Sequence, residues 1–161
     1  MSIPYKELHE RLQEEVEQFD LLYRSLEAEH QALTGNDLEG LEAAVADKEA
    51  RVARVQECGE ARTRFLQEAG FAPEADGMAA ALEQAPPELQ EELQQAWHAV
   101  RERLQQCQRQ NEVNGRVVRE GMRFSRQALY LLVGGDMPGS ELYGRDGATH
   151  GDAATRSYAK V

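Results

Sequence analysis

The sequence has few of the residues on which disulfide-stabilised folds and metal centres depend. Only two of its 161 residues are cysteines, Cys58 and Cys107, and they do not form a CxxC pair. Two separated cysteines indicate neither a disulfide framework nor a zinc site, so we expect both to be reduced, in or beside a core. Aromatic residues make up only 6% of the chain. The apolar residues are mostly Leu, Val and Ala, and the helix formers Glu, Gln, Arg and Ala fill much of the remainder.

Long apolar runs are also absent. The sequence has no stretch of about 18 apolar residues that could cross a membrane. Residues 1–10 carry charges where a signal peptide would need an apolar stretch. We therefore expect a cytoplasmic protein that does not insert directly into a membrane, and its length is that of a single domain.

Positive charge is scarce. The chain has 18 Lys and Arg against 29 Asp and Glu, for a net charge of -11. Nucleic-acid binding needs clustered cations that release counterions, so this balance argues against a nucleic-acid partner. One local basic cluster occurs, at Arg116, Arg119, Arg123 and Arg126. We interpret it as the solvated face of a helix.

Catalytic motifs are missing as well. The chain has four histidines and no HExxH, CxxC or P-loop pattern. Glu27 and His30 have the Glu-x-x-His spacing of di-iron ligands in ferritin-like bundles, but such a site needs two of these pairs and two further Glu residues. Neither His9 nor His98 has a Glu three residues before it. We therefore predict no enzyme activity, no metal site and no cofactor.

What the sequence does contain is a helical apolar period. Across residues 5–33, stripe positions recur alternately three and four residues apart, and only Glu15 and Glu29 among them are polar. This spacing predicts a helix with one apolar face. Pro4 suits its first turn, and Gly35 suits the left-handed residue just past its end.

A second helix is predicted over residues 38–69. Asn36 and Glu39 resemble a capping box at its start, and the apolar stripe resumes at once. The short link between the two helices would make them antiparallel, as an αα-hairpin. Lys48 and Arg62 fall on the stripe, and we expect their stems to pack while their charged heads reach water.

A connector and a long third helix are predicted next. Residues 70–87 contain prolines and glycines that interrupt the pattern, although residues 78–82 could form a short helix. The third helix is predicted over residues 87–133. At 1.5 Å per residue it would be about 70 Å long, against about 45 to 50 Å for the first two, so its end would overhang the hairpin.

The overhanging end is apolar on more than one face. Its large apolar residues are Val117, Val118, Met122, Phe124, Leu129, Tyr130, Leu131, Leu132 and Val133. A surplus of this kind requires a partner. The fold that we predict is therefore all-α: an elongated antiparallel helical hairpin plus a long third helix, forming a three-helix bundle.

Two asparagines interrupt the apolar stripe of the third helix, and two glycines lie on it or beside it. Asn111 and Asn114 occupy positions where a polar side chain can fix the register by hydrogen bonding across the seam. Gly115 and Gly121 let another backbone come close, at a cost in helix propensity of about 1 kcal/mol each. Two interpretations stay open: a bundle with a few packing irregularities, or a surface kept pliable for a partner helix.

The rest of the chain, residues 134–161, contains six glycines and no periodic stripe. We expect a disordered tail there, which divides the chain into a helical domain of residues 1–133 and a tail of residues 134–161. Leu142 and Tyr143 are isolated apolar residues in this tail and look like a short docking motif.

At the level of pattern, nearly the whole chain resembles the FlgN-type flagellar export chaperones of bacteria. The likeness includes the N-terminal hairpin, Trp97 some way ahead of Asn111-Glu112-Val113-Asn114-Gly115, the apolar helix end, and the tail segment Leu142-Tyr143-Gly144-Arg145-Asp146-Gly147. It rests mainly on Asn114-Gly115 and on Tyr143-Gly144.

The resemblance implies a function. A chaperone of this kind would bind the C-terminal helical ends of the hook-filament junction proteins FlgK and FlgL, prevent their premature assembly, and deliver them to the flagellar export apparatus. Its client site would be the apolar helix end, at Val117, Val118, Met122, Phe124, Leu129 and Leu132. Tyr143, with Leu142 and Gly144, would dock on the export-gate protein FlhA. Two alternative functions compete with this one. One is a self-associating structural or adaptor coiled coil, which the same helical pattern would serve, and the other is a metal-dependent bundle enzyme, for which stoichiometric iron or manganese in the purified protein would be the evidence.

Overall fold

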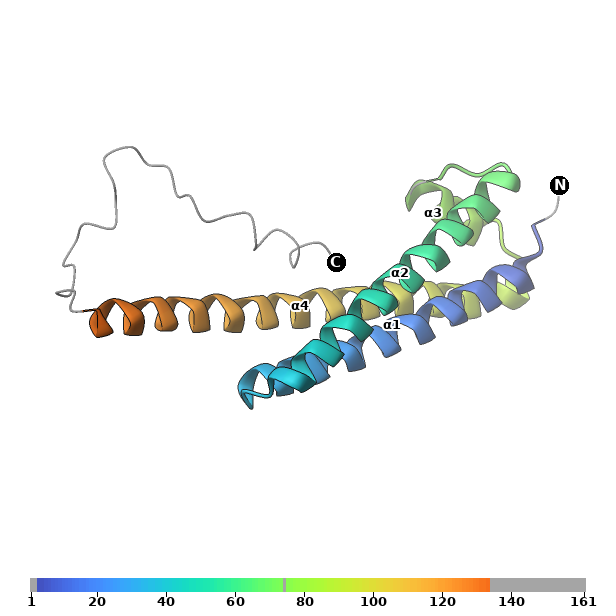
Figure 1. Ribbon diagram of the computed structural model, residues 1–161. Coiled ribbons are helices and arrows are strands. Elements are labelled where there is room, and N and C mark those ends of the chain that lie inside the picture. The colour runs from blue at the N-terminus through green and yellow to red at the C-terminus, as the bar shows by residue number, and fades with distance from the viewer. Residues whose placement is uncertain (1–2, 74, 134–161) are drawn as a thin grey trace, which may run out of the picture.

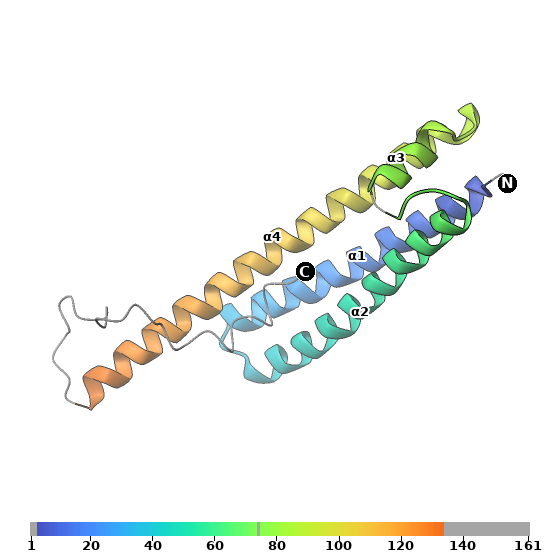
Figure 2. The ribbon, with the colours of Figure 1, turned by 90° about the horizontal axis from the view of Figure 1, so that it is seen from above.

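The computed structural model describes residues 3–73 and 75–133. Within these residues the chain forms four α-helices and no strand: α1 (Tyr5–Thr34), α2 (Leu38–Glu68), α3 (Ala75–Glu83) and α4 (Pro87–Leu132). Figures 1 and 2 show three long helices side by side, with the short α3 near the end of α2 and the start of α4. The predicted all-α fold is confirmed.

The central helix is α1, which lies between α2 and α4 (Figure 2). It packs along both of them, whereas α2 and α4 do not approach each other closely along their backbones. Asp20 pairs with Arg103, and the Leu26 carbonyl accepts a hydrogen bond from Asn114. Residue numbers thus rise together along the two helices, so α4 runs parallel to α1.

The core forms where the apolar stripe of α1 meets the other helices. Burying a large aliphatic side chain stabilises a fold by about 1.5 to 3 kcal/mol, so the buried apolar residues of this core contribute most of the stability. The large side chains that are fully buried include Leu8, Leu12, Leu22, Leu26, Leu66, Met78, Leu93 and Cys107.

Two cations of α2 lie inside the α1–α2 interface, each against a glutamate of α1. Lys48 Nζ is 2.8 Å from Glu29 Oε1, and Arg62 Nε is 2.9 Å from Glu15 Oε2. All four side chains are largely buried, so the prediction that the charged heads of Lys48 and Arg62 reach water was wrong. The two glutamates on the apolar stripe of α1 therefore pair with the two cations on the apolar stripe of α2.

The paired charges set the antiparallel register of the hairpin. The glutamates are 14 residues apart on α1, and their partners are 14 residues apart on α2. A slip of one heptad in either direction would place Glu15 or Glu29 against Val55 and leave a buried carboxylate unpaired. Burial of an unpaired charge is strongly unfavourable, so the observed register is selected.

The turn between α1 and α2 differs by one residue from the predicted one. The left-handed residue is Asn36, with φ 51°, and not Gly35, with φ -89°. The N-cap of α2 is Asp37 and not Asn36, because the Asp37 carboxylate accepts a hydrogen bond of 2.9 Å from the Gly40 backbone N–H. Asparagine adopts the left-handed conformation more readily than most residues. Because Asn36 takes this position in the turn, the next short polar residue, Asp37, caps α2.

The connector begins where α2 ends in a Schellman motif. Gly70 has φ 88°, Phe71 N–H donates to the Leu66 carbonyl, and Gly70 N–H donates to the Gln67 carbonyl, both at 2.9 Å. The short helix predicted in the connector is confirmed as α3. Three of its buried residues belong to the same hydrophobic core as the long helices: Met78, Ala81 and Leu82. None of the four described helices has the length and apolarity that a membrane span requires.

Candidate functional site

Helix α4 continues far beyond the hairpin on which it packs (Figure 1). It has 46 residues against 30 in α1, a difference of about 24 Å at 1.5 Å per residue. Residues 119–133 are all exposed, and we call this segment the α4 extension. The predicted overhang of the third helix is confirmed.

Large apolar side chains cover much of the α4 extension. The exposed ones are Met122 (50%), Phe124 (75%), Leu129 (63%), Tyr130 (42%), Leu131 (52%), Leu132 (84%) and Val133 (77%). Among the described residues, the other large apolar side chains with comparable exposure are Leu38 and Val113. Of the candidate binding residues, Val117 and Val118 are half-buried beside the extension. Such a concentration of exposed apolar surface is typical of surfaces that bind another protein.

Four apolar residues of the extension form two lines, one on each side of a line of small residues. The stripe of α4 that faces α1 continues into the extension at Gly121, Ser125 and Ala128. Met122 and Leu129, seven residues apart, lie along one side of it, and Phe124 and Leu131, also seven apart, lie along the other. A partner helix could come close along the small residues and contact large apolar side chains on both sides.

Asn114 joins α4 to the hairpin at the base of the extension. Its Nδ2 donates to the Leu26 carbonyl at 2.8 Å and to Glu29 Oε2 at 2.9 Å. Its Oδ1 accepts from Gln110 Nε2 at 3.0 Å and lies 3.1 Å from His30 Nδ1. A hydrogen-bonding role across the seam was predicted for this residue and is confirmed.

The other members of the predicted family motif lie beside Asn114. Asn111 is buried and Gly115 is half-buried. A Cβ at Gly115 would meet only the Arg119 guanidinium, at 3.3 Å, and one at Gly121 would meet nothing within 4 Å. Within the described chain, no second backbone lies against either glycine.

The extension differs in charge from the rest of the molecule. The first 118 residues carry 12 Lys and Arg against 24 Asp and Glu, whereas residues 119–133 carry three Arg and one Glu. Arg116, just before the extension, forms an ion pair with Glu112, with 3.7 Å between Nη2 and Oε1. Arg119, Arg123 and Arg126 form no ion pair with any other described residue. The α4 extension thus combines exposed apolar side chains with a net positive charge, whereas the protein as a whole is acidic.

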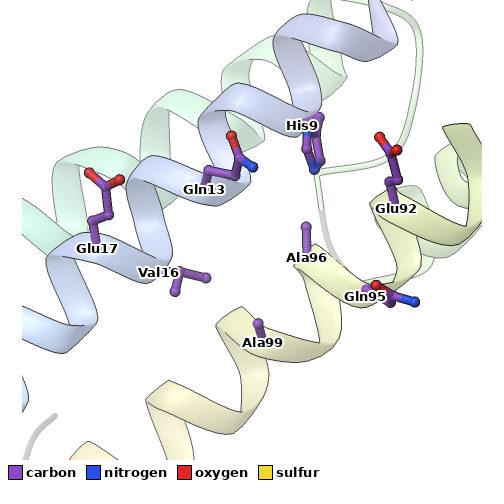
Figure 3. A pocket seen from close by; sticks show the side chains of 8 residues that line it. All are labelled: His9, Gln13, Val16, Glu17, Glu92, Gln95, Ala96 and Ala99. Carbon is purple, nitrogen blue, oxygen red and sulfur yellow. The ribbon is translucent and has the colours of Figure 1, made fainter.

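A second surface feature is a shallow pocket between α1 and α4 (Figure 3). Its volume is about 470 Å³, and its lining mixes polar side chains with small apolar ones: His9, Gln13, Val16, Glu17, Glu92, Gln95, Ala96 and Ala99. His9 from α1 and Glu92 from α4 lie near each other between the two helices, at one end of the lining (Figure 3). The described part of the chain has no group of three His, Cys, Asp or Glu side chains placed to hold a metal ion.

Neither cysteine is activated. Both are free thiols, and Cys107 is buried while Cys58 is half-buried, as predicted. Burial raises the pKa of the Cys107 thiol to about 12, and burial is also the main cause that raises the pKa of Cys58. The thiolate is the reactive form of cysteine, so the described structure assigns no nucleophilic role to either.

The predicted docking residues Leu142, Tyr143 and Gly144 lie outside the described residues.

The family model described as FlgN protein matches residues 1–151 of the chain. No curated protein and no solved structure matches it.

Proposed function

Since the chain belongs to the FlgN family, we propose that the α4 extension is the surface on which it binds the C-terminal helical segments of FlgK-like and FlgL-like proteins. The family's general function is that of a flagellar export chaperone for hook-filament junction proteins. The family is a chaperone family for which no enzyme activity is known. The proposal adds the identity of the clients and the place where they bind.

The observation that carries the proposal is the exposure of the extension. Seven large apolar side chains, from Met122 to Val133, remain in contact with water on a segment that α1 and α2 do not cover. Exposure of so much apolar surface is unfavourable, and the burial of each such side chain on binding is worth about 1.5 to 3 kcal/mol. A client helix would remove this surface from water.

The mechanism that fits this surface is recognition of an amphipathic helix by an apolar face. The client would lay its apolar stripe along Gly121, Ser125 and Ala128, between the lines of Met122 and Phe124. Binding would cover the client surface through which the junction protein assembles. Masking requires only this binding equilibrium, and no bond is made or broken.

The anchor at Asn114 supports this mechanism. Because its side chain bonds to Leu26 and Glu29 of α1, the base of the extension is fixed to the hairpin before a client arrives. A preformed surface loses less conformational entropy on binding than a disordered one. The hairpin would therefore act as a rigid mount for the extension.

The test of the client site uses residues whose change should not disturb folding. In Met122→Ser/Leu129→Ser, two exposed side chains lose their apolar surface, so the free energy of unfolding should stay the same. Affinity for a purified hook-filament junction protein, measured by calorimetry, should fall about a hundredfold, because about 3 kcal/mol of apolar burial is lost.

A matched control is Leu38→Ser, which removes an equally exposed leucine at the start of α2. It should bind the client as the wild type does. Equal loss of affinity in the control and the double variant would remove the extension from the proposal.

We also propose that Tyr143, in residues 134–161, docks on the export-gate protein FlhA after the client is bound. An aromatic residue offers a large apolar area and one hydroxyl, as interface anchors commonly do. Tyr143→Ala should leave helix content and client affinity intact while reducing binding to the gate protein and secretion of the client. Normal export by this variant would refute the docking role.

A self-associating adaptor would use the same exposed surface, because the extensions of two copies could cover each other. Light scattering after size-exclusion chromatography separates the two functions. A monomer that forms a one-to-one complex with the junction protein supports the chaperone. A stable dimer that Leu129→Ser and Leu132→Ser dissociate supports the adaptor.

A further inference from the structure

Arginines line one side of the apolar surface on the α4 extension. Arg119 and Arg126 are seven residues apart, and each precedes a residue of the Met122 and Leu129 line by three positions. Residues three apart on a helix are neighbours, so the two guanidinium groups follow the edge of that line. All four side chains are exposed.

The opposite side of the apolar surface has no such charge. Phe124 and Leu131 lie along it, and the nearest polar residues beyond them are Glu120 and Gln127, whereas Arg123 lies farther round, on the back of the helix. The extension therefore presents an apolar surface with one basic edge and one edge that is not basic. This asymmetry, together with the lack of ion pairs to Arg119 and Arg126 in the described chain, calls for negative charge on the partner.

We propose that the α4 extension selects amphipathic helices that carry Asp or Glu at seven-residue spacing along one edge, and that Arg119 and Arg126 pair with these carboxylates. The inference rests on the proposed function and specifies which helices the site accepts. Charged residues at the edges of a helix pair select partner and orientation in coiled coils, and the heptad spacing of the two arginines matches that arrangement.

A single basic edge also fixes the direction of the bound helix. If the client helix is turned end for end with the same face down, its two edges change places. Its carboxylates would then lie beside Phe124 and Leu131, where they would lose their hydration without gaining a cation. Only one direction lets the carboxylates meet Arg119 and Arg126.

A helix with apolar and basic faces can also bind an anionic lipid surface. Here the charge of the remaining molecule argues against it. The 118 residues before the extension carry 24 acidic side chains against 12 basic ones, and the Asn114 anchor holds this acidic body at the base of the extension. An anionic membrane would repel the body, whereas a single client helix would not have to approach it.

Two synthetic helical peptides of about 20 residues, each about 30 Å long, test the proposal with the full chain. Both carry leucines at heptad positions. One has Glu along a single edge, and the other has Lys at the same positions. The wild type should bind the Glu peptide about tenfold more tightly than the Lys peptide, and 0.5 M salt should reduce this difference, since salt screens exposed charges.

The matching variant is Arg119→Glu/Arg126→Glu, which should prefer the Lys peptide. Its control is Arg101→Glu/Arg109→Glu, which makes the same change of charge at two exposed positions in the body of α4 and should keep the wild-type preference. Equal affinity of the wild type for both peptides, or an unchanged preference in the Arg119→Glu/Arg126→Glu variant, overturns the proposal.

Two further outcomes are informative. If neither peptide binds, and Met122→Ser/Leu129→Ser binds a junction protein like the wild type, the proposed function itself has failed. If vesicles with about a third phosphatidylserine bind the wild type but not the Arg119→Glu/Arg126→Glu variant, the arginines serve a lipid surface and the inference is overturned.

Discussion

Asn114 of α4 donates a hydrogen bond of 2.9 Å from Nδ2 to Glu29 Oε2 of α1. The other oxygen of the same carboxylate accepts from Lys48 Nζ of α2 at 2.8 Å. One buried carboxylate thus connects all three long helices, at the level where α4 leaves the hairpin. Buried charges are stable only when paired and hydrogen-bonded, so each partner of Glu29 should contribute measurably to folding.

Replacement of Asn114 tests the connection to α4. Asn114→Ala would leave Glu29 Oε2 and the Leu26 carbonyl without this donor, so the free energy of unfolding should fall by about 2 to 3 kcal/mol. Urea denaturation followed by circular dichroism measures it. Gln110→Ala, which removes only a bond to Asn114 Oδ1, is the control and should cost about 1 kcal/mol or less. Equal losses in the two variants would contradict the role of the carboxylate.

Replacement of Lys48 tests the buried ion pair. Lys48→Met leaves the Glu29 carboxylate buried without its cation, which should cost about 3 to 5 kcal/mol of unfolding free energy. Arg54 on the same helix contacts Glu14 and Glu57 at the exposed surface, and Arg54→Met should cost about 1 kcal/mol or less. The prediction fails if the two variants have the same urea midpoint and slope.

The helices of this protein can be predicted from the sequence because apolar residues recur along the chain at helical spacing. The three-four stripe marks the face of each helix that is buried, and Pro87 marks where α4 begins. The stripe does not say which partner each face meets. The ion pairs of Glu15 and Glu29 can be predicted only once the register of the hairpin is known. Without the register, the pattern is equally compatible with Lys48 and Arg62 side chains whose charged heads reach water.

The candidate site could be predicted in place but not in detail. The excess length of the third helix is evident from residue numbers, and it predicts the exposed end with Phe124, Leu129 and Leu132. The partners of Asn114 depend on the axial offset between α1 and α4, and the spacing of the apolar residues does not determine this offset. The turn was misplaced by one residue because Gly35, Asn36 and Asp37 all favour turns, and only the backbone shows which is left-handed.

The buried thiol of Cys107 predicts a pH dependence of stability. In the unfolded chain this thiol should titrate near its ordinary pKa of 9.0, but burial raises its pKa in the folded chain to about 12. The folded protein therefore keeps a proton that the unfolded chain has lost. The resulting stabilisation is fully present below about pH 9 and is lost as the pH rises toward 12.

Urea denaturation at pH 8 and at pH 10.5 should reveal this effect. The unfolding free energy of the wild type should decrease with pH more steeply than that of Cys107→Ala, by up to about 1.4 kcal/mol per pH unit. In the native protein, an alkylating reagent should modify the half-buried Cys58 before Cys107. Identical pH slopes, or rapid modification of Cys107, would contradict this description of the core.

The location of the client site is tested most directly by hydrogen–deuterium exchange with and without a purified hook-filament junction protein. Residues 119–133 are all exposed, and up to Leu132 they form the end of α4, so their amides should exchange quickly in the free protein. On addition of the client, exchange should slow in residues 119–133 and stay unchanged in α2. Protection confined to α2, with no change in residues 119–133, would contradict the assignment of the α4 extension as the client-binding surface.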